Sequence, residues 1–200
     1  FKRYIIILLL FNKSFDIIIK NSVYKLLEVT MEQYSNKKFS LFEFNNLEAN
    51  DENKYELIDE IVLMSPRPNY MHQQIMSRLN LEIGTYLKGK KCMVFSEVEL
   101  EFDNNVIIPD LSIICGLNDF NIQRYKKAPE LVIEIISPGS QYTDTFTKLY
   151  KYELFGVKEY WIANPKTEII TVYNFENKTN KDYGKQEKLI SSVFNDLEIN

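Results

Sequence analysis

The chain has 200 residues, a length that fits one domain with a short appendage. Apolar residues make up 45% of the sequence, which excludes a disordered chain and allows a sizeable hydrophobic core. The formal net charge is −4, so the basic surplus typical of proteins that coat nucleic acid non-specifically is absent, and only a local basic patch stays open.

Cysteine and histidine are too few for a zinc site. Cys92 and Cys115 stand far apart and form no CxxC pair, and His72 is the only histidine. Two such cysteines are typical of a reducing cytoplasm, where they behave as small buried hydrophobes. The sequence therefore predicts two free thiols and a cytoplasmic protein.

The first thirty residues differ in composition from the rest. Residues 4–11, YIIILLLF, are an apolar run too short for a transmembrane helix, which needs ~20 apolar residues, and no signal-peptide cleavage pattern follows it. A domain-like pattern starts just after the first methionine, Met31. We therefore expect residues 1–30 to be an extension outside the domain, from upstream translation or a non-native addition, and residues 31–200 to form the domain. The alternative is a membrane-surface anchor, but no membrane partner is expected.

The first half of the domain alternates strand and helix patterns. Residues 55–65 predict a strand pair or a bent strand, and residues 70–88 predict an amphipathic helix. The apolar residues of that helix recur at four-residue spacing: Met71, Ile75, Leu79, Ile83 and Leu87. Residues 94–102 alternate apolar residues with Glu97, Glu99 and Glu101, which predicts one half-exposed strand with the glutamates facing solvent.

The second half continues as strands around one helix. Residues 106–115 and 131–136 predict apolar strands, and residues 144–155 predict a helix with Gly156 as its C-cap. Residues 159–163 and 169–175 predict a hairpin that turns at Asn164-Pro165. The polar stretch 177–186 predicts a loop, and residues 187–194 predict a final edge strand. The pattern predicts an α/β fold with a mixed central sheet flanked by helices.

Two carboxylates interrupt the apolar strands. Glu134 lies between isoleucines, where an unpaired charge costs several kcal/mol, so we expect a partner or a metal ion. Asp110 follows Pro109, which removes a ladder hydrogen bond and predicts an edge strand or a bend. The alternatives are a solvent-facing Glu134 and an ordinary turn aspartate. Two acids on neighbouring strands suit Mg²⁺, with Mn²⁺ as the second choice, and a phosphodiester hydrolase also needs a lysine nearby.

The residues after Glu134 form an ordered motif. Ser137-Pro138, Asp144, Lys148, Tyr152, Gly156-Val157 and Glu159-Tyr160-Trp161 follow it in turn. Together with Tyr55–Asp59, Ser65-Pro66, His72 and Pro109-Asp110, they resemble the Uma-type restriction-endonuclease-like family of the PD-(D/E)XK nuclease superfamily, over roughly residues 38–176. The chain departs from the pattern at Glu60, where the family has glycine, and at Ile136, where the superfamily has lysine.

The resemblance implies a single restriction-endonuclease-like domain whose catalytic residues are Asp110, Glu134 and Lys148. Asp110 and Glu134 are then the metal ligands, and Lys148 replaces the lysine missing at position 136. Asp144 and Lys148 share a helix face at i, i+4, so a plain surface ion pair is the alternative for Lys148. We expect auxiliary roles at four positions: Glu56, His72, Asp144 and Tyr152.

The leading hypothesis is a Mg²⁺-dependent endonuclease that hydrolyses DNA through a metal-activated water. The alternatives are a non-catalytic module that binds nucleic acid or protein on a nuclease fold, and a structural or toxin–antitoxin-like partner. DNA is the expected partner because the resemblance implies it, and a homodimer stays open. Tyr160 and Trp161 are expected in the core rather than as base-stacking platforms.

Overall fold

The computed structural model describes residues 37–48, 53–137, 140 and 143–199. From Phe39 onward the chain packs as one compact unit. The extension expected at residues 1–30 lies outside the described residues, so its separation from the domain stays a prediction. Within the described ranges, no helix is both long and apolar enough to cross a membrane.

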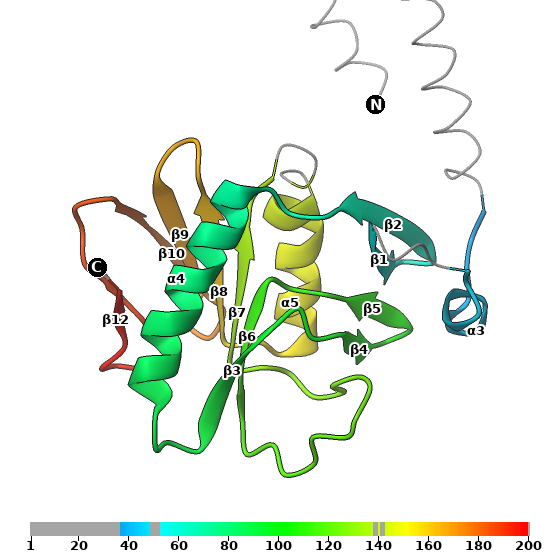
Figure 1. Cartoon of the computed structure of the whole chain (residues 1–200), viewed down its shortest axis with the longest axis horizontal. Coiled ribbons are helices and arrows are strands. Elements are labelled where there is room, and N and C mark those ends of the chain that lie inside the picture. Colours follow the sequence, from blue (N-terminus) through cyan, green and yellow to red (C-terminus); the bar gives the residue numbers. More distant parts are fainter. Residues whose placement is uncertain (1–36, 49–52, 138–139, 141–142, 200) are drawn as a thin grey trace, which may run out of the picture. The chain divides into compact units, whose positions relative to one another are not determined.

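A six-stranded mixed sheet forms the centre of this unit, in the order β10-β9-β8-β7-β6-β3 (Figure 1). Its strands are β3 (Cys92–Ser96), β6 (Leu111–Cys115), β7 (Leu131–Ile135), β8 (Glu159–Asn164), β9 (Ile169–Asn174) and β10 (Thr179–Gly184). The β7–β8 pair is parallel and the other neighbours are antiparallel. Every residue of β7 is buried, so a polar side chain on this strand needs a partner inside the protein.

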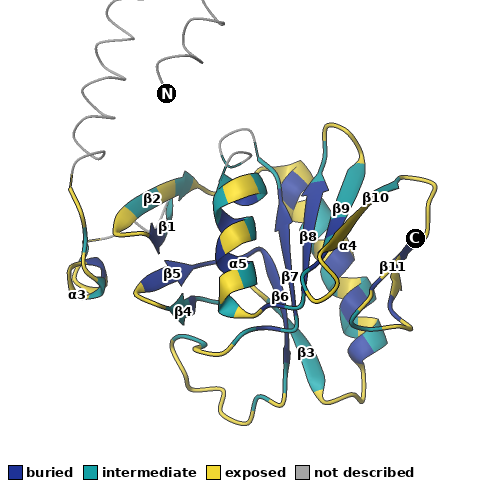
Figure 2. Ribbon diagram, turned by 180° about the vertical axis from the view of Figure 1, so that it is seen from behind, coloured by how far each residue is buried: buried dark blue, intermediate teal, exposed yellow. Residues whose placement is uncertain are grey.

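The two long helical segments cover opposite faces of this sheet, as the views from the two sides in Figures 1 and 2 show. On one face, α4 (Tyr70–Leu87) packs Leu79 and Ile83 against Leu131 and Ile133. On the other, α5 (Leu149–Phe155) packs Tyr152 against Val132. Because alternate residues of a strand point to opposite faces, Glu134 points to the same side as Val132, toward α5.

A second, four-stranded sheet adjoins the α5 side, in the order β2-β1-β5-β4. Its strands are β1 (Asn53–Ile58), β2 (Ile61–Pro66), β4 (Leu100–Phe102) and β5 (Asn105–Ile107). The short helix α3 (Leu41–Asn45), which begins with a Ser40–Glu43 capping box, packs Phe44 on this sheet. Near the C-terminus, β11 (Leu189–Ile190) pairs with β12 (Glu198–Ile199).

Several predictions from periodicity are confirmed. The strand pair at 55–65, the helix at 70–88, the strand at 131–136 and the 159–175 hairpin are all present. Gly156 ends α5 in the left-handed conformation with φ 91°. In α4, Met71 is 56% exposed. Four-residue steps advance the helix by about 40° beyond each full turn, so the far end of the stripe rotates away from the core.

Two strands predicted as continuous are each broken in two. Residues 94–102 form β3 and β4 in different sheets, because Glu97 takes a left-handed φ of 50° between them. Residues 106–115 form β5 and β6, again in different sheets, and the break falls at Pro109-Asp110. The bend expected from the proline is confirmed, but β6 lies between β7 and β3 and is not an edge strand.

The polar C-terminal region was predicted wrongly. Residues expected to form a loop at 177–186 contain β10, which pairs with β9 along its whole length. Its side chains are mostly exposed because β10 lies at the sheet edge, and Figure 2 shows it largely yellow. The edge strand expected at 187–194 is only the two-residue β11, which pairs with β12 rather than with the central sheet.

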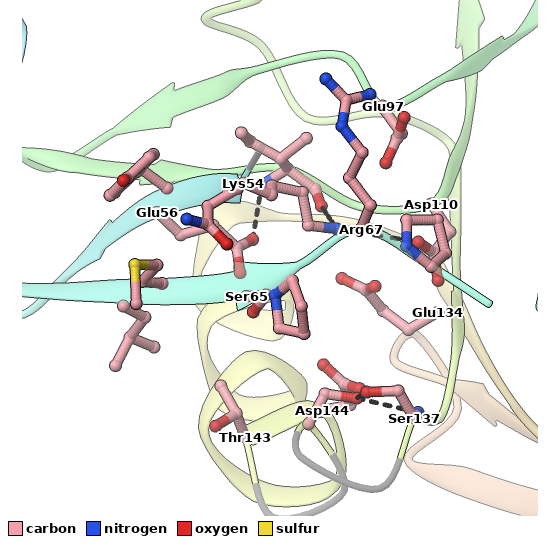
Figure 3. A pocket seen from close by; sticks show the side chains of 18 of the residues that line it. Lys54, Glu56, Ser65, Arg67, Glu97, Asp110, Glu134, Ser137, Thr143 and Asp144 are labelled. Carbon is pink, nitrogen blue, oxygen red and sulfur yellow. Dashed lines mark hydrogen bonds and ion pairs between the residues drawn. The ribbon is translucent and has the colours of Figure 1, made fainter. Parts of the chain in front are cut away.

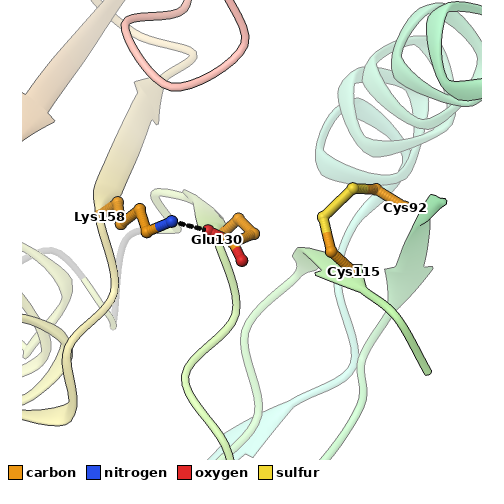
Figure 4. The surroundings of a disulfide bond; sticks show 4 residues. All are labelled: Cys92, Cys115, Glu130 and Lys158. Carbon is orange, nitrogen blue, oxygen red and sulfur yellow. Dashed lines mark ion pairs between the residues drawn. A yellow bond between two sulfur atoms is a disulfide. The ribbon is translucent and has the colours of Figure 1, made fainter. Parts of the chain in front are cut away.

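The prediction of two free thiols is also wrong. β3 and β6 pair antiparallel with Cys92 opposite Cys115, and the two cysteines form a disulfide (Figure 4). Residues far apart in sequence become cross-strand neighbours through this pairing, which spacing alone does not show. The disulfide removes the cysteine-based argument for a reducing compartment.

Candidate active site

Asp110 and Glu134 lie opposite each other where the two sheets meet. β6 and β7 pair with Leu111 opposite Ile133, so the next step along this register brings Asp110 opposite Glu134. The two carboxylates are 3% and 2% exposed. Both line a cleft with a volume of about 1120 Å³ (Figure 3). The structure therefore brings the two acids into one cleft, and their role as metal ligands stays a prediction.

Asp110 is held as an ionised carboxylate. Its Oδ2 contacts His72 Nε2 at 3.0 Å and accepts a hydrogen bond from the Ile135 backbone N–H at 2.7 Å. Burial raises the pKa of Asp110, but the His72 hydrogen bond, the Lys54 charge and the Ile135 N–H together lower it below its usual value. His72 reaches this position from the first turn of α4, where the Asn69 side chain caps the helix by accepting from the His72 N–H.

Glu134 has the opposite electrostatic environment. Its Oε1 accepts from Lys148 Nζ at 2.9 Å and from the Tyr152 hydroxyl at 2.8 Å. Burial raises its pKa to about 8; Lys148 opposes this shift, whereas the charges of Asp144 and Asp110 add to it. Glu134 therefore holds a proton at neutral pH when no cation is bound.

Lys148 and Asp144 come from η1 (Thr143–Lys148), a π-helical turn that runs directly into α5. Lys148 Nζ lies 2.9 Å from both Glu56 Oε1 and Glu134 Oε1, and 3.6 Å from Asp144 Oδ1. Burial alone lowers the pKa of Lys148, but these three carboxylates raise it well above its usual value. Three acids surround this one lysine. We therefore infer that Lys148 keeps its positive charge and that the acid cluster, rather than Lys148, takes part in proton exchange.

β1 connects the four-stranded sheet to this cluster. Glu56 Oε1 accepts from the Ile108 backbone N–H at 2.7 Å, and Lys54 Nζ donates to the Ile108 carbonyl at 3.1 Å. Lys54 and Glu56 are two residues apart, so both side chains leave the same face of the strand. Together they hold both backbone polar groups of the residue that precedes Pro109-Asp110.

Comparison with known proteins identifies the family. The model of the Uma2 family, described as "Putative restriction endonuclease", matches residues 41–200. The chain belongs to the Uma2 family. A solved structure, described as a "putative nuclease belonging to DUF820" from Anabaena variabilis, has a TM-score of 0.71 at 20% identity, over 80% of this chain and 94% of that one. It shows that the fold is shared. An uncharacterized protein of Synechocystis sp. is 24% identical over 144 residues, 68% of this chain and 74% of that protein.

These comparisons support a nuclease and confirm both the resemblance and the restriction-endonuclease-like fold. In this Uma2 member, six of the seven residues singled out from the sequence line the cleft: Glu56, His72, Asp110, Glu134, Asp144 and Lys148. The seventh, Tyr152, is buried behind them and hydrogen-bonds Glu134. Tyr160 and Trp161 are fully buried, as expected of core residues. The catalytic roles themselves stay predictions.

The acidic ladder is less solvated than predicted. Arg124 donates to Glu99 Oε2 at 2.6 Å and to Glu101 Oε2 at 3.3 Å, and both glutamates are only partly exposed. Of the three glutamates only Glu97 is exposed, and it lines the cleft. The strand break at Glu97 separates these residues, so they do not form one solvent-facing row.

Lys54 is the member of the site that the sequence analysis missed. Its Nζ lies 3.7 Å from Asp110 Oδ1, and its side chain is 22% exposed. The signal was present, because Lys54 stands two residues before Glu56 and a period of two places both on one strand face. Nothing in its immediate sequence, however, links this strand to the Pro109-Asp110 segment.

The side chains in the cleft suit a hard divalent cation. Four carboxylates, those of Glu56, Asp110, Glu134 and Asp144, face the ammonium groups of Lys54 and Lys148, so with all of them ionised two negative charges stay uncompensated. Asp144 Oδ1 is buried without a hydrogen-bond partner. The described ranges contain no group of three or more His, Cys, Asp or Glu side chains arranged to hold a metal ion by themselves. The carboxylate oxygens of the cleft are the ligand type that Mg²⁺ takes, and Mg²⁺ needs few protein ligands because it keeps several waters.

Proposed function

We propose that this Uma2 protein is an endonuclease that hydrolyses DNA phosphodiester bonds with the help of Mg²⁺, for which Mn²⁺ can substitute. The observation that carries the proposal is the buried pair of Asp110, directly before β6, and Glu134 on β7, with Lys148 paired to Glu134. The family model and the solved nuclease-like structure support the same reaction class.

In the proposed reaction, a water oxygen forms a bond to phosphorus and the bond from phosphorus to one sugar oxygen breaks. The attacking water loses one proton and the leaving oxygen gains one, so the net change is the consumption of one water. Asp110 and Glu134 would hold the cation, which lowers the pKa of a bound water and stabilises charge on the phosphoryl oxygens. The buried acids would repel a phosphate, and such a cation would offset that repulsion.

The surrounding residues orient the two acids. His72 and the Ile135 N–H fix Oδ2 of Asp110, and Tyr152 and Lys148 fix Oε1 of Glu134. Lys148 also supplies the positive charge that the superfamily places at position 136, here Ile136. Such supporting hydrogen bonds around metal ligands are needed for affinity and activity.

The test is cleavage of plasmid, linear and single-stranded DNA by the full chain in Mg²⁺, in Mn²⁺ and in EDTA. We expect cutting only with metal, and loss of cutting in Asp110→Asn, which keeps the side-chain shape and removes one charge. Glu97→Gln is the matched control, because Glu97 lines the same cleft but is exposed. Equal cutting by Asp110→Asn and the wild type at saturating Mg²⁺ refutes the proposal, and absence of cutting in every condition favours the non-catalytic binding module.

A further inference from the structure

The two lysines of the site differ in what they can still bind. Lys148 is 3% exposed, and its ammonium group is surrounded by Glu56, Glu134 and Asp144. Glu56 Oε1 and Glu134 Oε1 each lie 2.9 Å from its Nζ, and Asp144 Oδ1 lies 3.6 Å away, so buried acids on this side of the cleft balance its positive charge. To reach a substrate, Lys148 would have to leave buried acids, which is strongly unfavourable.

Lys54 keeps donors for a ligand. One of its N–H groups goes to the Ile108 carbonyl, and the Asp110 carboxylate at 3.7 Å lies beyond hydrogen-bond distance. Its side chain is 22% exposed and lines the cleft, where Figure 3 labels it beside Glu56 and Asp110. Burial lowers the pKa of Lys54, but the nearby acids, Glu134 first, raise it above its usual value, so the group is charged.

We propose that Lys54 is the catalytic lysine that contacts the scissile phosphate of DNA, and that Lys148 is a positioning residue that holds the buried acids. This inference rests on the proposed nuclease function. Two features favour a phosphate: the ammonium stands beside Asp110, where the cation would be held, and its remaining donors face the cleft. A lysine ammonium binds phosphate as a point charge and needs no fixed planar geometry.

A purely structural role for Lys54 gives different expectations. Lys54 would then act only through the Ile108 carbonyl and Asp110, and its loss would change metal affinity but no DNA contact. A phosphate contact adds to the salt dependence of DNA binding, because each neutralised phosphate releases counterions. The salt slope therefore separates the two roles.

The experiment compares the wild type with Lys54→Met, Lys54→Gln and Lys54→Arg. Lys54→Gln keeps a donor for the Ile108 carbonyl and removes the charge, so it stays informative if Lys54→Met fails to fold. Lys185→Met is the matched control, because Lys185 is 72% exposed and pairs with Glu168, neither of which lines the cleft. Single-turnover cleavage is measured in Mg²⁺. Binding of a short duplex is measured in Ca²⁺ at several salt concentrations, with a gel to check that the duplex is intact.

We expect Lys54→Met and Lys54→Gln to cleave about 100-fold more slowly. Their slope of log K against log salt should be smaller by about one. Lys54→Arg should keep the slope, and Lys185→Met should keep both rate and slope. A salt slope in Lys54→Gln equal to that of the wild type overturns the inference. If this variant also binds Mg²⁺ more weakly, Lys54 is a positioning residue. If the wild type binds DNA but does not cleave it, and the salt slope is still smaller in Lys54→Gln, the phosphate contact stands and only the proposed hydrolysis is refuted. No DNA binding by the wild type would refute both.

Discussion

Asp110 and Glu134 sit in environments that shift their pKa values in opposite directions. Hydrogen bonds from His72 and Ile135 lower the pKa of Asp110, whereas burial raises that of Glu134 to about 8. Neighbouring acids whose pKa values are shifted in opposite directions are typical of sites that exchange protons or bind cations. A bound cation has to displace the proton of Glu134, so metal binding and protonation are linked at this residue.

The first prediction concerns the stability of the metal-free protein. Folded Glu134 keeps its proton to about pH 8, whereas an unfolded glutamate loses it near 4.5, so the folded state binds more protons in between. The free energy of unfolding therefore falls as pH rises from about 5 to about 8, by at most about 1.4 kcal/mol per pH unit from this group. Glu134→Gln should remove this slope. Urea unfolding in EDTA across that range measures it, and equal slopes in both proteins contradict the assignment.

The second prediction concerns Lys148. Lys148→Met leaves Glu56, Glu134 and Asp144 buried without their cation, which should lower the free energy of unfolding by about 3–5 kcal/mol in EDTA. Cleavage should fall by orders of magnitude, because Glu134 loses its orientation. Adding Ile136→Lys should restore part of the rate, since position 136 shares the strand face of Glu134.

Single-turnover cleavage, with circular dichroism as the folding check, measures both Lys148 variants. Full activity and unchanged stability in Lys148→Met would show that Lys148 forms only an ordinary ion pair and has no role in the site. Cleavage that Ile136→Lys does not restore at all would show that the position of the ammonium matters, and not only its charge.

At the scale of elements, the site depends on where regular structure is interrupted. The break at Pro109 frees Asp110 from the β6 ladder, and the π-helical turn η1 brings Asp144 and Lys148 onto one side. π-helical turns are rare and are frequent at functional sites. The proline predicted its break, because proline removes a ladder donor, but the π turn has no comparable signal in the sequence.

Elements with a strong period were predictable, and those without one were not. α4 follows from its apolar stripe, and α5 from its glycine cap at position 156. β10 lacks a period because its polar residues lie on an exposed edge, where pairing with β9 supplies the stability. The break at Glu97 was missed because the residues around it keep the alternation of a single strand.

The third prediction uses two glycines to test these elements. Gly156 has φ 91°, and a Cβ there would meet only Ala128 Cβ at 3.8 Å, so Gly156→Ala should destabilise by about 1 kcal/mol through backbone strain alone. Gly84 lies inside α4, and a Cβ there would meet Val94 Cγ1 at 3.6 Å. Gly84→Ala should therefore stabilise by about 0.5–1 kcal/mol. Urea unfolding of the two variants measures both changes. A change in the free energy of unfolding in the same direction for both variants would contradict the assigned conformations.

At the scale of the whole molecule, the site is assembled from segments far apart in the sequence. Lys54 and Glu56 come from the four-stranded sheet, whereas Glu134 belongs to the central sheet and Lys148 to η1. The sequence predicted the acids and Lys148 because the family motif runs through them in order. It did not predict Lys54 or the Cys92–Cys115 disulfide, because both depend on pairing between strands that share no local pattern.

The central claim is that Asp110 and Glu134 together hold one divalent cation, and calorimetric titration of Mn²⁺ and Mg²⁺ into the metal-free protein tests it most directly. We expect a single ion per chain, with release of about one proton near pH 7 because Glu134 must ionise. Asp110→Asn and Glu134→Gln should each weaken binding at least about 10-fold, since each removes a charged ligand. Glu97→Gln should bind like the wild type. Wild-type affinity in both Asp110→Asn and Glu134→Gln would contradict the account.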